Sequence, residues 1–287
     1  MRYAIIPAAG FATRFLPASK CVPKELFPIL DKPAAQYIVE EAVSAGINSV
    51  IFITGMGKES ILDHFDTINP KFPVAKLNSD IKSRIEDLDS LVDVISVRQK
   101  KPLGLGHAVL KGAELVDRKS FSVLLPDMLV VPTGSVNSML EMVKLHERTG
   151  RSVIALMKVP EHMKSKYGIV EGTSLGNNLL KITKMIEKPA PGSTDSNLAV
   201  VGRYILTPSI IEILEKQEIK KGSEMQLTDA IVKLLDSEEV LGMVIDDDNL
   251  IFDTGSVEGF VLANTFLAMK RFPEFRNSLK DLLEKNL

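Results

Sequence analysis

Four side chains that can hold an anion follow the first apolar segment of the chain, residues 3–8. They are Thr13, Arg14, Lys20 and Lys24. The small residues Ala8, Ala9 and Gly10 precede them, and such residues let backbone N–H groups approach phosphate oxygens closely. A solvated turn with surface lysines would be simpler, but it needs no row of cations beside a buried strand. The spacing therefore favours a phosphate-binding loop.

Two aspartates end apolar stretches of strand length. Asp127 follows "FSVLLP" and Asp253 follows "LIF". Each alone is more often a turn or capping residue. As a pair near a phosphate loop they favour Mg²⁺, because this ion takes carboxylate oxygens and keeps water and substrate phosphates as its other ligands.

Glu187 and Lys188 stand side by side before Pro189, at the end of another strand-like stretch. Neighbours in a strand point to opposite faces, so both reach one ligand only if the chain bends there. Pro189 is compatible with a bend. The residues alone fit an exposed ion pair equally well.

Gln99 lies in "RQKKPLGLGHAV", which turns through proline and glycine and enters a helix near Gly106. Its amide offers one donor and one acceptor group to the edge of a flat base. Taken alone, the segment is better explained as a plain loop before a helix.

Other chemistries lack their sequence signatures. Neither a Walker loop nor the dinucleotide glycine fingerprint is present, and "GMGKES" has Phe52 where a Walker loop needs glycine. The four histidines have no ligand spacing, so we expect solvated or capping roles for them. Cys21, the only cysteine, excludes an internal disulfide and a thiolate cluster, and we expect it to be a bystander.

The elements that carry these residues alternate between strand-length and helix-period segments. Strands are expected at residues 3–8, 49–55, 92–99, 121–127 and 152–159, with helices between them. This rhythm predicts an α/β fold with a doubly wound, mostly parallel, Rossmann-like sheet that is covered on both faces. Ligands bind beyond the carboxyl ends of such strands, so the first loop, Gln99 and Asp127 should converge on one edge.

From about Tyr167 the rhythm changes to strand-like segments without long helices, which indicates a β-rich elaboration of the sheet. We expect a single domain over residues 1–287, with parts at 1–160 and 161–256 and C-terminal helices at 257–287. Residues 67–91 are polar and are the best candidate for a variable insertion.

Composition limits the partners. The 287 residues carry 35 Lys+Arg against 37 Asp+Glu, a net charge of −2, so no overall field attracts nucleic acid or an anionic membrane. The chain begins without a signal-peptide pattern, and no apolar run reaches the length of about 18 residues that a membrane helix needs. We therefore expect a cytoplasmic protein that binds neither nucleic acid nor membrane.

Taken in order, nine motifs resemble those of the bacterial UTP–glucose-1-phosphate uridylyltransferases, or UDP-glucose pyrophosphorylases, of the sugar nucleotidyltransferase family. The resemblance runs from residue 3 to about 268 and leaves residues 67–91 unmatched. The motifs are "PAAGFATRFLPASK", "PKELFPILDKPAAQYIVEEAVSAGI", "PLGLGHAV", "LLPD", "YGIV", "IEKP", "SNLAVVGRYILTP", "GSEMQLTDAI" and "FDTGSVEGF".

The resemblance implies a nucleotide-binding part at 1–160, a sugar-binding part at 161–256, and a homodimer or homotetramer. It implies UTP, glucose 1-phosphate, UDP-glucose and pyrophosphate as substrates and products, with Mg²⁺ as cofactor. The implied nucleotide-binding residues are Ala8, Ala9, Gly10, Thr13, Gln99 and Gly104. The implied sugar-binding residues are Gly168, Glu187 and Gly202. The implied catalytic phosphate contacts are Arg14, Lys24 and Lys188, and the implied metal ligands are Asp127 and Asp253.

One departure stands out, since Ala12 replaces the second glycine of the family's Gly-x-Gly-Thr-Arg loop. Thr13 and Arg14 are retained, so we expect an active enzyme. Two alternatives stay open. One is a sibling transferase that uses dTTP or CTP, and the other is a non-catalytic homologue that binds UDP-glucose and regulates a partner.

Overall fold

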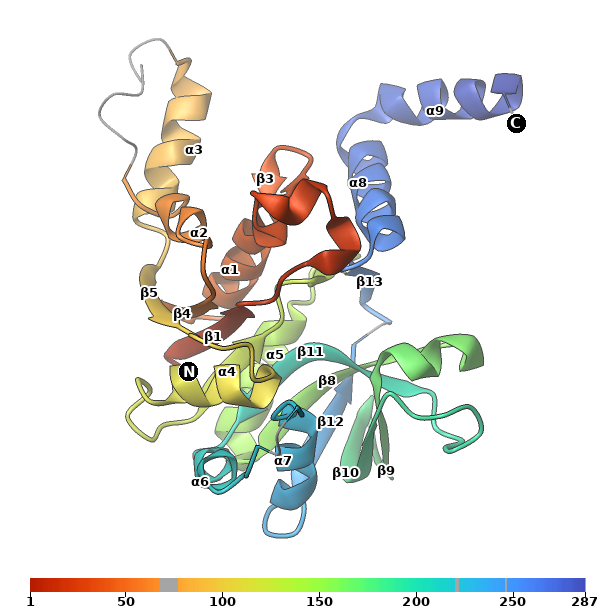
Figure 1. Ribbon diagram of the computed structural model, residues 1–287. Coiled ribbons are helices and arrows are strands. Elements are labelled where there is room, and N and C mark those ends of the chain that lie inside the picture. The colour runs from red at the N-terminus through yellow and green to blue at the C-terminus, as the bar shows by residue number, and fades with distance from the viewer. Residues whose placement is uncertain (68–76, 220–221, 246, 287) are drawn as a thin grey trace.

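A nine-stranded sheet forms the centre of the protein in the computed structural model, which describes residues 1–67, 77–219, 222–245 and 247–286 (Figure 1). In spatial order the strands are β5 (Asp93–Arg98), β4 (Ser49–Thr54), β1 (Tyr3–Ala8), β6 (Phe121–Leu124), β11 (Leu198–Leu206), β8 (Ser152–Lys158), β12 (Val240–Val244), β10 (Leu179–Glu187) and β9 (Gly168–Gly176). The strands expected in the first half of the chain are therefore confirmed.

The strand directions confirm a mostly parallel sheet. β5, β4, β1 and β6 pair in parallel, and so do β8 and β12. β11 is antiparallel to both β6 and β8, while β10 is antiparallel to β12 and β9. Seven of the nine strands consequently run in one direction, and only β11 and β10 are reversed.

β11 is not simply added at the edge of the sheet, as a β-rich elaboration would suggest. This strand comes from the β-rich part of the chain, yet it lies in the middle of the sheet between β6 and β8. Eight of its nine residues are buried, as is expected for a strand in the middle of a sheet that is covered on both faces. Strands of residues 1–160 and 161–256 thus share one continuous sheet.

Helices cover both faces of this sheet. α1 (Ala34–Ser44) and α5 (Ser138–Thr149) pack on one face through buried residues such as Ile38 and Met142. α4 (Leu105–Ala113), α6 (Ser209–Glu215) and α7 (Leu227–Leu234) pack on the other, through residues such as Val109. Full burial of one such side chain contributes about 1.5–3 kcal/mol, so these two apolar layers fix the helices. The doubly wound arrangement is confirmed.

Smaller elements complete the architecture. They are β2 (Pro28–Ile29), β3 (Lys32–Pro33), β7 (Met128–Pro132), β13 (Asn249–Asp253), α2 (Ser60–Asp63), α3 (Ser79–Asp89), α8 (Val257–Arg271) and α9 (Pro273–Asn286). β13 pairs with β7 outside the main sheet, and the helix break expected at Pro273 is confirmed. Of the expected insertion, residues 68–76 lie outside the described residues. Within the described ranges, no helix has the length and apolar character that a membrane crossing requires.

The carboxyl ends of the parallel strands meet at one edge, as expected. Ala8 pairs with Thr54 and Thr54 with Arg98, so β1, β4 and β5 end level with one another. The loops that follow β1, β4, β5 and β6 therefore leave the sheet together and can build one site.

Candidate active site

Two adjoining cavities lie at this edge of the sheet. One of about 530 Å³ is lined by the loop after β1 together with Gln99 and Lys100. The other, of about 220 Å³, is lined by Asp127 and by the ends of β9, β10 and β11. Arg14, in the second, and Lys24, in the first, come from the same loop, so that loop reaches both cavities.

The loop of residues 9–24, called the phosphate loop below, contains two short 3-10 helices, at Thr13–Phe15 and Ala18–Lys20, and a third begins at its last residue, Lys24. Ala9, Gly10 and Thr13 line the larger cavity, whereas Ala8 is fully buried at the end of β1. Ala12 adopts a left-handed conformation, with φ 52°. A residue with a Cβ atom loses about 1–2 kcal/mol there, which gives the physical reason for a glycine at this position in related loops.

A buried ion pair holds the turn that carries Lys24. The side chain of Glu25 is 1% exposed and accepts a hydrogen bond from Lys58 Nζ at 2.6 Å. Lys58 belongs to the "GMGKES" stretch, so these residues anchor the phosphate loop to the loop after β4. Removing one partner of a buried pair is strongly destabilising, because it leaves an uncompensated charge.

Lys24 also joins the two cavities. Its Nζ donates to Asp127 Oδ2 at 2.7 Å. Burial alone would raise the pKa of Asp127, but the Lys24 ammonium outweighs it and holds that pKa below its usual value. Burial would likewise lower the pKa of Lys24, and Asp127 outweighs this and raises it. Both groups are therefore charged at neutral pH.

A buried arginine fixes the turn that contains Asp127. Arg203, 1% exposed, donates to the backbone oxygens of Leu125 at 3.1 Å and Met128 at 2.6 Å. Glu41 of α1 receives two further hydrogen bonds from the same guanidinium, at 2.8 and 2.7 Å. Residues 125–128, called the carboxylate turn below, are thus clamped on both sides of Asp127.

The second predicted metal ligand lies next to the first. Asp253 ends β13, opposite Met128 at the start of β7. A Cβ atom added at Gly255 would lie 3.0 Å from both Asp127 Oδ2 and Asp253 Oδ1, so the two carboxylates face a common space that glycine leaves open. Burial and the charge of Asp127 raise the pKa of Asp253.

These two carboxylates fit Mg²⁺ held jointly with a substrate. The described residues contain no cluster of three or more histidine, cysteine or acidic side chains that could hold a metal alone. Mg²⁺ commonly takes one or two carboxylates and completes its shell with water and phosphate oxygens. The donor set therefore suits this ion.

Glu187 and Lys188 reach the same cavity because the chain bends between them. Lys188 has a left-handed backbone, with φ 45°, and its Nζ lies 3.7 Å from Glu187 Oε1. The other carboxylate oxygen of Glu187 accepts from Thr228 Oγ1 at 2.7 Å. The chain therefore has the bend that Glu187 and Lys188 need in order to reach one ligand.

Two glycines shape the smaller cavity. Gly202 lies at an irregularity of β11 with φ 74°, and a Cβ atom there would approach the Leu125 side chain to 2.9 Å. A Cβ atom at Gly168 would lie 3.3 Å from Glu187 Oε2. Both predicted sugar-pocket glycines consequently leave room beside Glu187 and the carboxylate turn.

Gln99 faces the larger cavity from the end of β5. Its Nε2 donates to the Gly104 backbone oxygen at 3.2 Å and lies 2.8 Å from His107 Nδ1. Gly104 lines neither cavity, and its contact with the site is the hydrogen bond that its backbone oxygen accepts from Gln99. The expectation of a solvated or capping role was wrong for His107, which is half-buried against Gln99.

Sequence reasoning missed several supporting residues. They are Glu25, Glu41, Lys58, His107, Arg203 and Thr228. Arg203 directly follows Gly202 within one motif, and a charged residue inside such an apolar strand was the available signal. His107 lies eight residues from Gln99 in the same motif, so their closeness in sequence was a signal as well. The partners of the others lie far along the chain, so spacing gave no indication of them.

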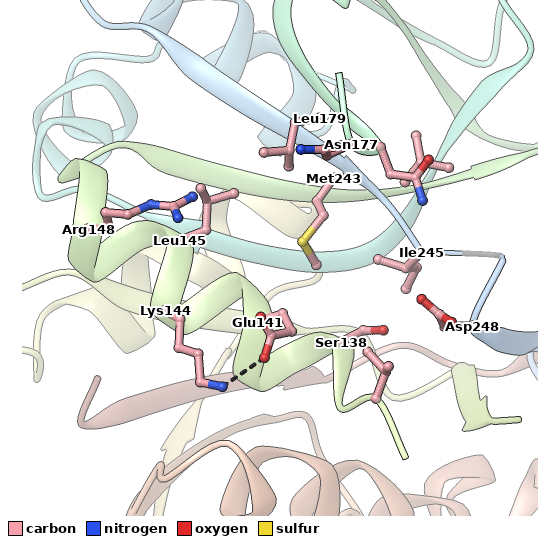
Figure 2. Close-up of a pocket in the computed structure, with 13 residues that line it drawn as sticks. Ser138, Glu141, Lys144, Leu145, Arg148, Asn177, Leu179, Met243, Ile245 and Asp248 are labelled. Carbon is pink, nitrogen blue, oxygen red and sulfur yellow. Dashed lines mark hydrogen bonds and ion pairs between the residues drawn. The ribbon is translucent and has the colours of Figure 1, made fainter. Parts of the chain in front are cut away.

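A further cavity of about 400 Å³ lies away from this edge (Figure 2). It is bordered by α5 residues such as Lys144 and Arg148, by Asn177 in the β9–β10 turn, and by Met243 of β12. None of the predicted site residues lines it. The candidate chemistry therefore belongs to the two cavities at the strand ends.

Comparisons with known proteins identify the family. The profile of the nucleotidyl transferase family matches residues 3–270. A Staphylococcus saprophyticus protein named UTP–glucose-1-phosphate uridylyltransferase 1 is 41% identical over 272 residues, 94% of this chain and 93% of that protein. A UDP-glucose pyrophosphorylase solved with UDP-glucose has 36% identity and a TM-score of 0.85, over 94% of this chain and 99% of that one. A UTP-bound UGPase from Acinetobacter baumannii has 36% identity and a TM-score of 0.85, over 100% of both chains.

Proposed function

The chain belongs to the nucleotidyl transferase family, and we propose that it is a UTP–glucose-1-phosphate uridylyltransferase. It transfers the uridylyl group of UTP to glucose 1-phosphate, giving UDP-glucose and pyrophosphate. One contact carries the proposal. The Lys24–Asp127 ion pair joins a cavity suited to a triphosphate to a cavity suited to a sugar phosphate, which is the arrangement that a transfer between them needs.

The reaction requires charge neutralisation rather than a base. A phosphate oxygen of glucose 1-phosphate attacks the α-phosphorus of UTP, a new P–O bond forms, and the bond to the pyrophosphate breaks. The second pKa of a sugar phosphate is about 6, so the attacking oxygen is already ionised at pH 7. The protein therefore contributes positioning and electrostatic stabilisation.

The residues divide this task by their place. Ala9, Gly10 and Thr13 lie where they can hold the triphosphate. Arg14, from the smaller cavity, and Lys24 both act on Asp127, where the two cavities adjoin, and there they stabilise the departing pyrophosphate. Cations preorganised around a transferring phosphoryl group lower the barrier because they need no rearrangement during the reaction.

On the sugar side, Lys188 neutralises the phosphate of glucose 1-phosphate and Glu187 accepts from glucose hydroxyls. Thr228 already occupies one oxygen of Glu187, so the carboxylate is held in a fixed orientation toward the cavity. A site that pairs buried polar groups with particular hydroxyls rejects sugars that leave them unpaired.

Asp127 and Asp253 would hold Mg²⁺, which when bound neutralises negative charge on the nucleotide phosphate oxygens. Their shared open space beside Gly255 supports this assignment. Lys24 keeps Asp127 ionised and ready to act as a ligand.

We further propose that the enzyme acts in the cytoplasm as a homodimer or homotetramer. Its proposed substrates are charged metabolites that cells retain. Exposed apolar side chains on α8 and in the following segment, such as Val261, Leu262 and Phe272, support contact between copies. Light scattering during size-exclusion chromatography tests the oligomeric state.

Pyrophosphate release with glucose 1-phosphate and each nucleoside triphosphate in turn tests the activity. We expect release with UTP that is abolished by chelation and restored by Mg²⁺. Release with dTTP or CTP alone would indicate a different base specificity with the same mechanism. Binding of UDP-glucose without release from any nucleotide would instead indicate a non-catalytic homologue.

A further inference from the structure

The amide of Gln99 is held from two sides before any nucleotide enters. Its backbone N–H donates to Thr54 O at 2.8 Å, and its side chain is 7% exposed at the wall of the larger cavity. Nε2 lies 3.2 Å from Gly104 O and 2.8 Å from His107 Nδ1. Among the described residues, no donor is bonded to Oε1.

The chemistry of these partners fixes which way the amide points. A backbone oxygen only accepts hydrogen bonds, so Nε2 and not Oε1 must face Gly104. The second hydrogen of Nε2 then faces His107 Nδ1, which must be an unprotonated acceptor with its own proton on Nε2. Burial, with Lys111 adding to it and Glu114 opposing it, lowers the pKa of His107 and so favours this neutral form.

Both acceptors belong to one rigid unit. Gly104 precedes α4 with φ 101°, and His107 lies in the first turn of that helix. Gly106 N donates to Met225 O at 2.8 Å, and Met225 N donates to Leu103 O at 2.7 Å. A Cβ atom at Gly104 would lie 2.6 Å from Met225 O, so this packing admits only glycine. The helix start therefore holds the two acceptors in a constant relation to Gln99.

We propose that His107 is a positioning residue for base selection: it consumes the second donor of the Gln99 amide, so that only Oε1 is presented to the base. This inference rests on the proposed function, in which the base lies against Gln99. Uracil and thymine carry a hydrogen on N3 that Oε1 can accept. Cytosine carries an unprotonated N3, which would meet Oε1 as a second acceptor.

Binding should discriminate accordingly. A site that hydrogen-bonds a polar group of its ligand rejects an analogue that leaves the buried polar group of the protein unpaired. This discrimination can exceed that of a single apolar contact by orders of magnitude. We expect wild-type protein to bind UTP at least about 10-fold more tightly than CTP. dTTP also carries N3–H, so the ratio of UTP to dTTP should not depend on His107.

The test compares two substitutions of this histidine. His107→Leu removes the acceptor and frees the second N–H of the Gln99 amide, whereas His107→Asn places Oδ1 near the position of Nδ1 and keeps an acceptor. His162→Leu, at an exposed histidine elsewhere, is the matched control. Calorimetric affinities for UTP, CTP and dTTP are measured for each variant, and circular dichroism confirms folding.

We expect His107→Leu to lower the UTP:CTP affinity ratio by about 10-fold while the UTP:dTTP ratio stays constant. His107→Asn and His162→Leu should keep the wild-type UTP:CTP ratio within about threefold. An unchanged UTP:CTP ratio in folded His107→Leu would overturn the proposal, as would equal affinity of wild-type protein for UTP and CTP. Pyrophosphate release is measured in parallel. Intact base selectivity without release would reject the proposed activity and leave the role of His107 standing.

Discussion

The carboxylate turn and the phosphate loop lie next to each other but are held in different ways. The carboxylate turn is clamped by Arg203, which is itself buried and doubly bonded to Glu41. Most residues of the phosphate loop are exposed, and Phe15 is its buried anchor, with ring centroids 5.2 Å from Phe27 and 5.8 Å from Phe260. Within the loop, Ser19 Oγ donates to Ala12 O at 2.7 Å.

The free energies of the contacts that hold the two regions differ. Breaking a buried ion pair destabilises a protein by about 3–5 kcal/mol, and the Glu25–Lys58 pair supplies such a contact at the Lys24 end of the phosphate loop. Further back in the loop, the hydrogen bond of Ser19 is an ordinary one, which contributes about 1 kcal/mol. The carboxylate turn is therefore the rigid side of the site, where ligands must be placed before the reaction. Residues 9–22 of the phosphate loop lie before the Glu25–Lys58 ion pair and are mostly exposed, so we expect this part of the loop to adjust as a triphosphate enters and pyrophosphate leaves.

Removal of the central carboxylate should have the largest effect. We expect Asp127→Ala to lower turnover by about 10² or more, because it removes one predicted metal ligand and the partner of Lys24. Steady-state pyrophosphate release measures this change. The control, Asp236→Ala at an exposed position at the end of α7, should retain activity. Near-normal turnover in folded Asp127→Ala would remove this carboxylate from the mechanism.

Loss of the sugar-phosphate cation should follow closely. Lys188→Ala should reduce turnover by about 10², since one electrostatic stabiliser is lost. Lys184, four residues earlier on β10, pairs with Glu171 at the surface, so Lys184→Ala is the matched control and should change turnover little. Equal turnover in the two variants would contradict the assignment of Lys188.

Weakening the clamp should have an intermediate effect. Glu41→Gln removes the charge opposite Arg203, and we expect a loss of about 2–3 kcal/mol in unfolding free energy. Turnover should fall by roughly 10-fold because the carboxylate turn is less well positioned. Urea denaturation and kinetics measure the two effects, with Glu40→Gln as the neighbouring control. A stability loss with unchanged turnover would limit the clamp to a structural role.

Replacing the left-handed Ala12 by glycine should change stability and activity little. Ala12→Gly removes backbone strain of about 1 kcal/mol in the native state but adds flexibility of similar size to the unfolded chain. We expect an unfolding free energy within about 1 kcal/mol of wild type and a kcat/KM for UTP within about threefold, as an adaptable loop allows. A change in kcat/KM beyond roughly 10-fold would mean that the loop is as tightly specified as the carboxylate turn.

A surface ion pair away from both regions should affect stability alone. Arg271 and Arg84 hold the pKa of Asp31 well below its usual value of about 3.9. A depressed carboxyl pKa stabilises the fold above the unfolded value and loses this contribution as the pH falls through the folded value. Asp31→Asn should therefore lower Tm only slightly at pH 7, because exposed ion pairs contribute little to stability, and turnover should be unchanged. The difference in Tm should shrink below about pH 4, and a constant difference would contradict the ionic origin.

The elements of the nucleotide-binding half followed closely from the sequence. β1, β4 and β8 begin and end within a residue of the expected positions, because apolar segments of strand length report local burial. Pro189 was compatible with the bend at Lys188, but the sequence fitted an exposed ion pair equally well. The loops that meet at the sheet edge followed from the rule for parallel strands.

The supporting contacts could not be predicted in this way. Glu41 and Arg203 are 162 residues apart, and Lys24 and Asp127 are 103 apart. Arg203 lies in an apolar strand, which indicates burial but not its partner, and the other three could be solvated surface charges as far as their neighbours in sequence indicate. Only the order of the strands decides which charges meet inside the protein.

The sequence by itself determined the types of residue available for chemistry, the local elements that carry them, and the resemblance to a family. The tertiary structure alone decided that β11 enters the centre of the sheet, that Arg203 clamps the carboxylate turn, and that His107 orients Gln99. The physical reason is that periodicity reports whether a residue is buried, while its partner is chosen by packing between distant segments.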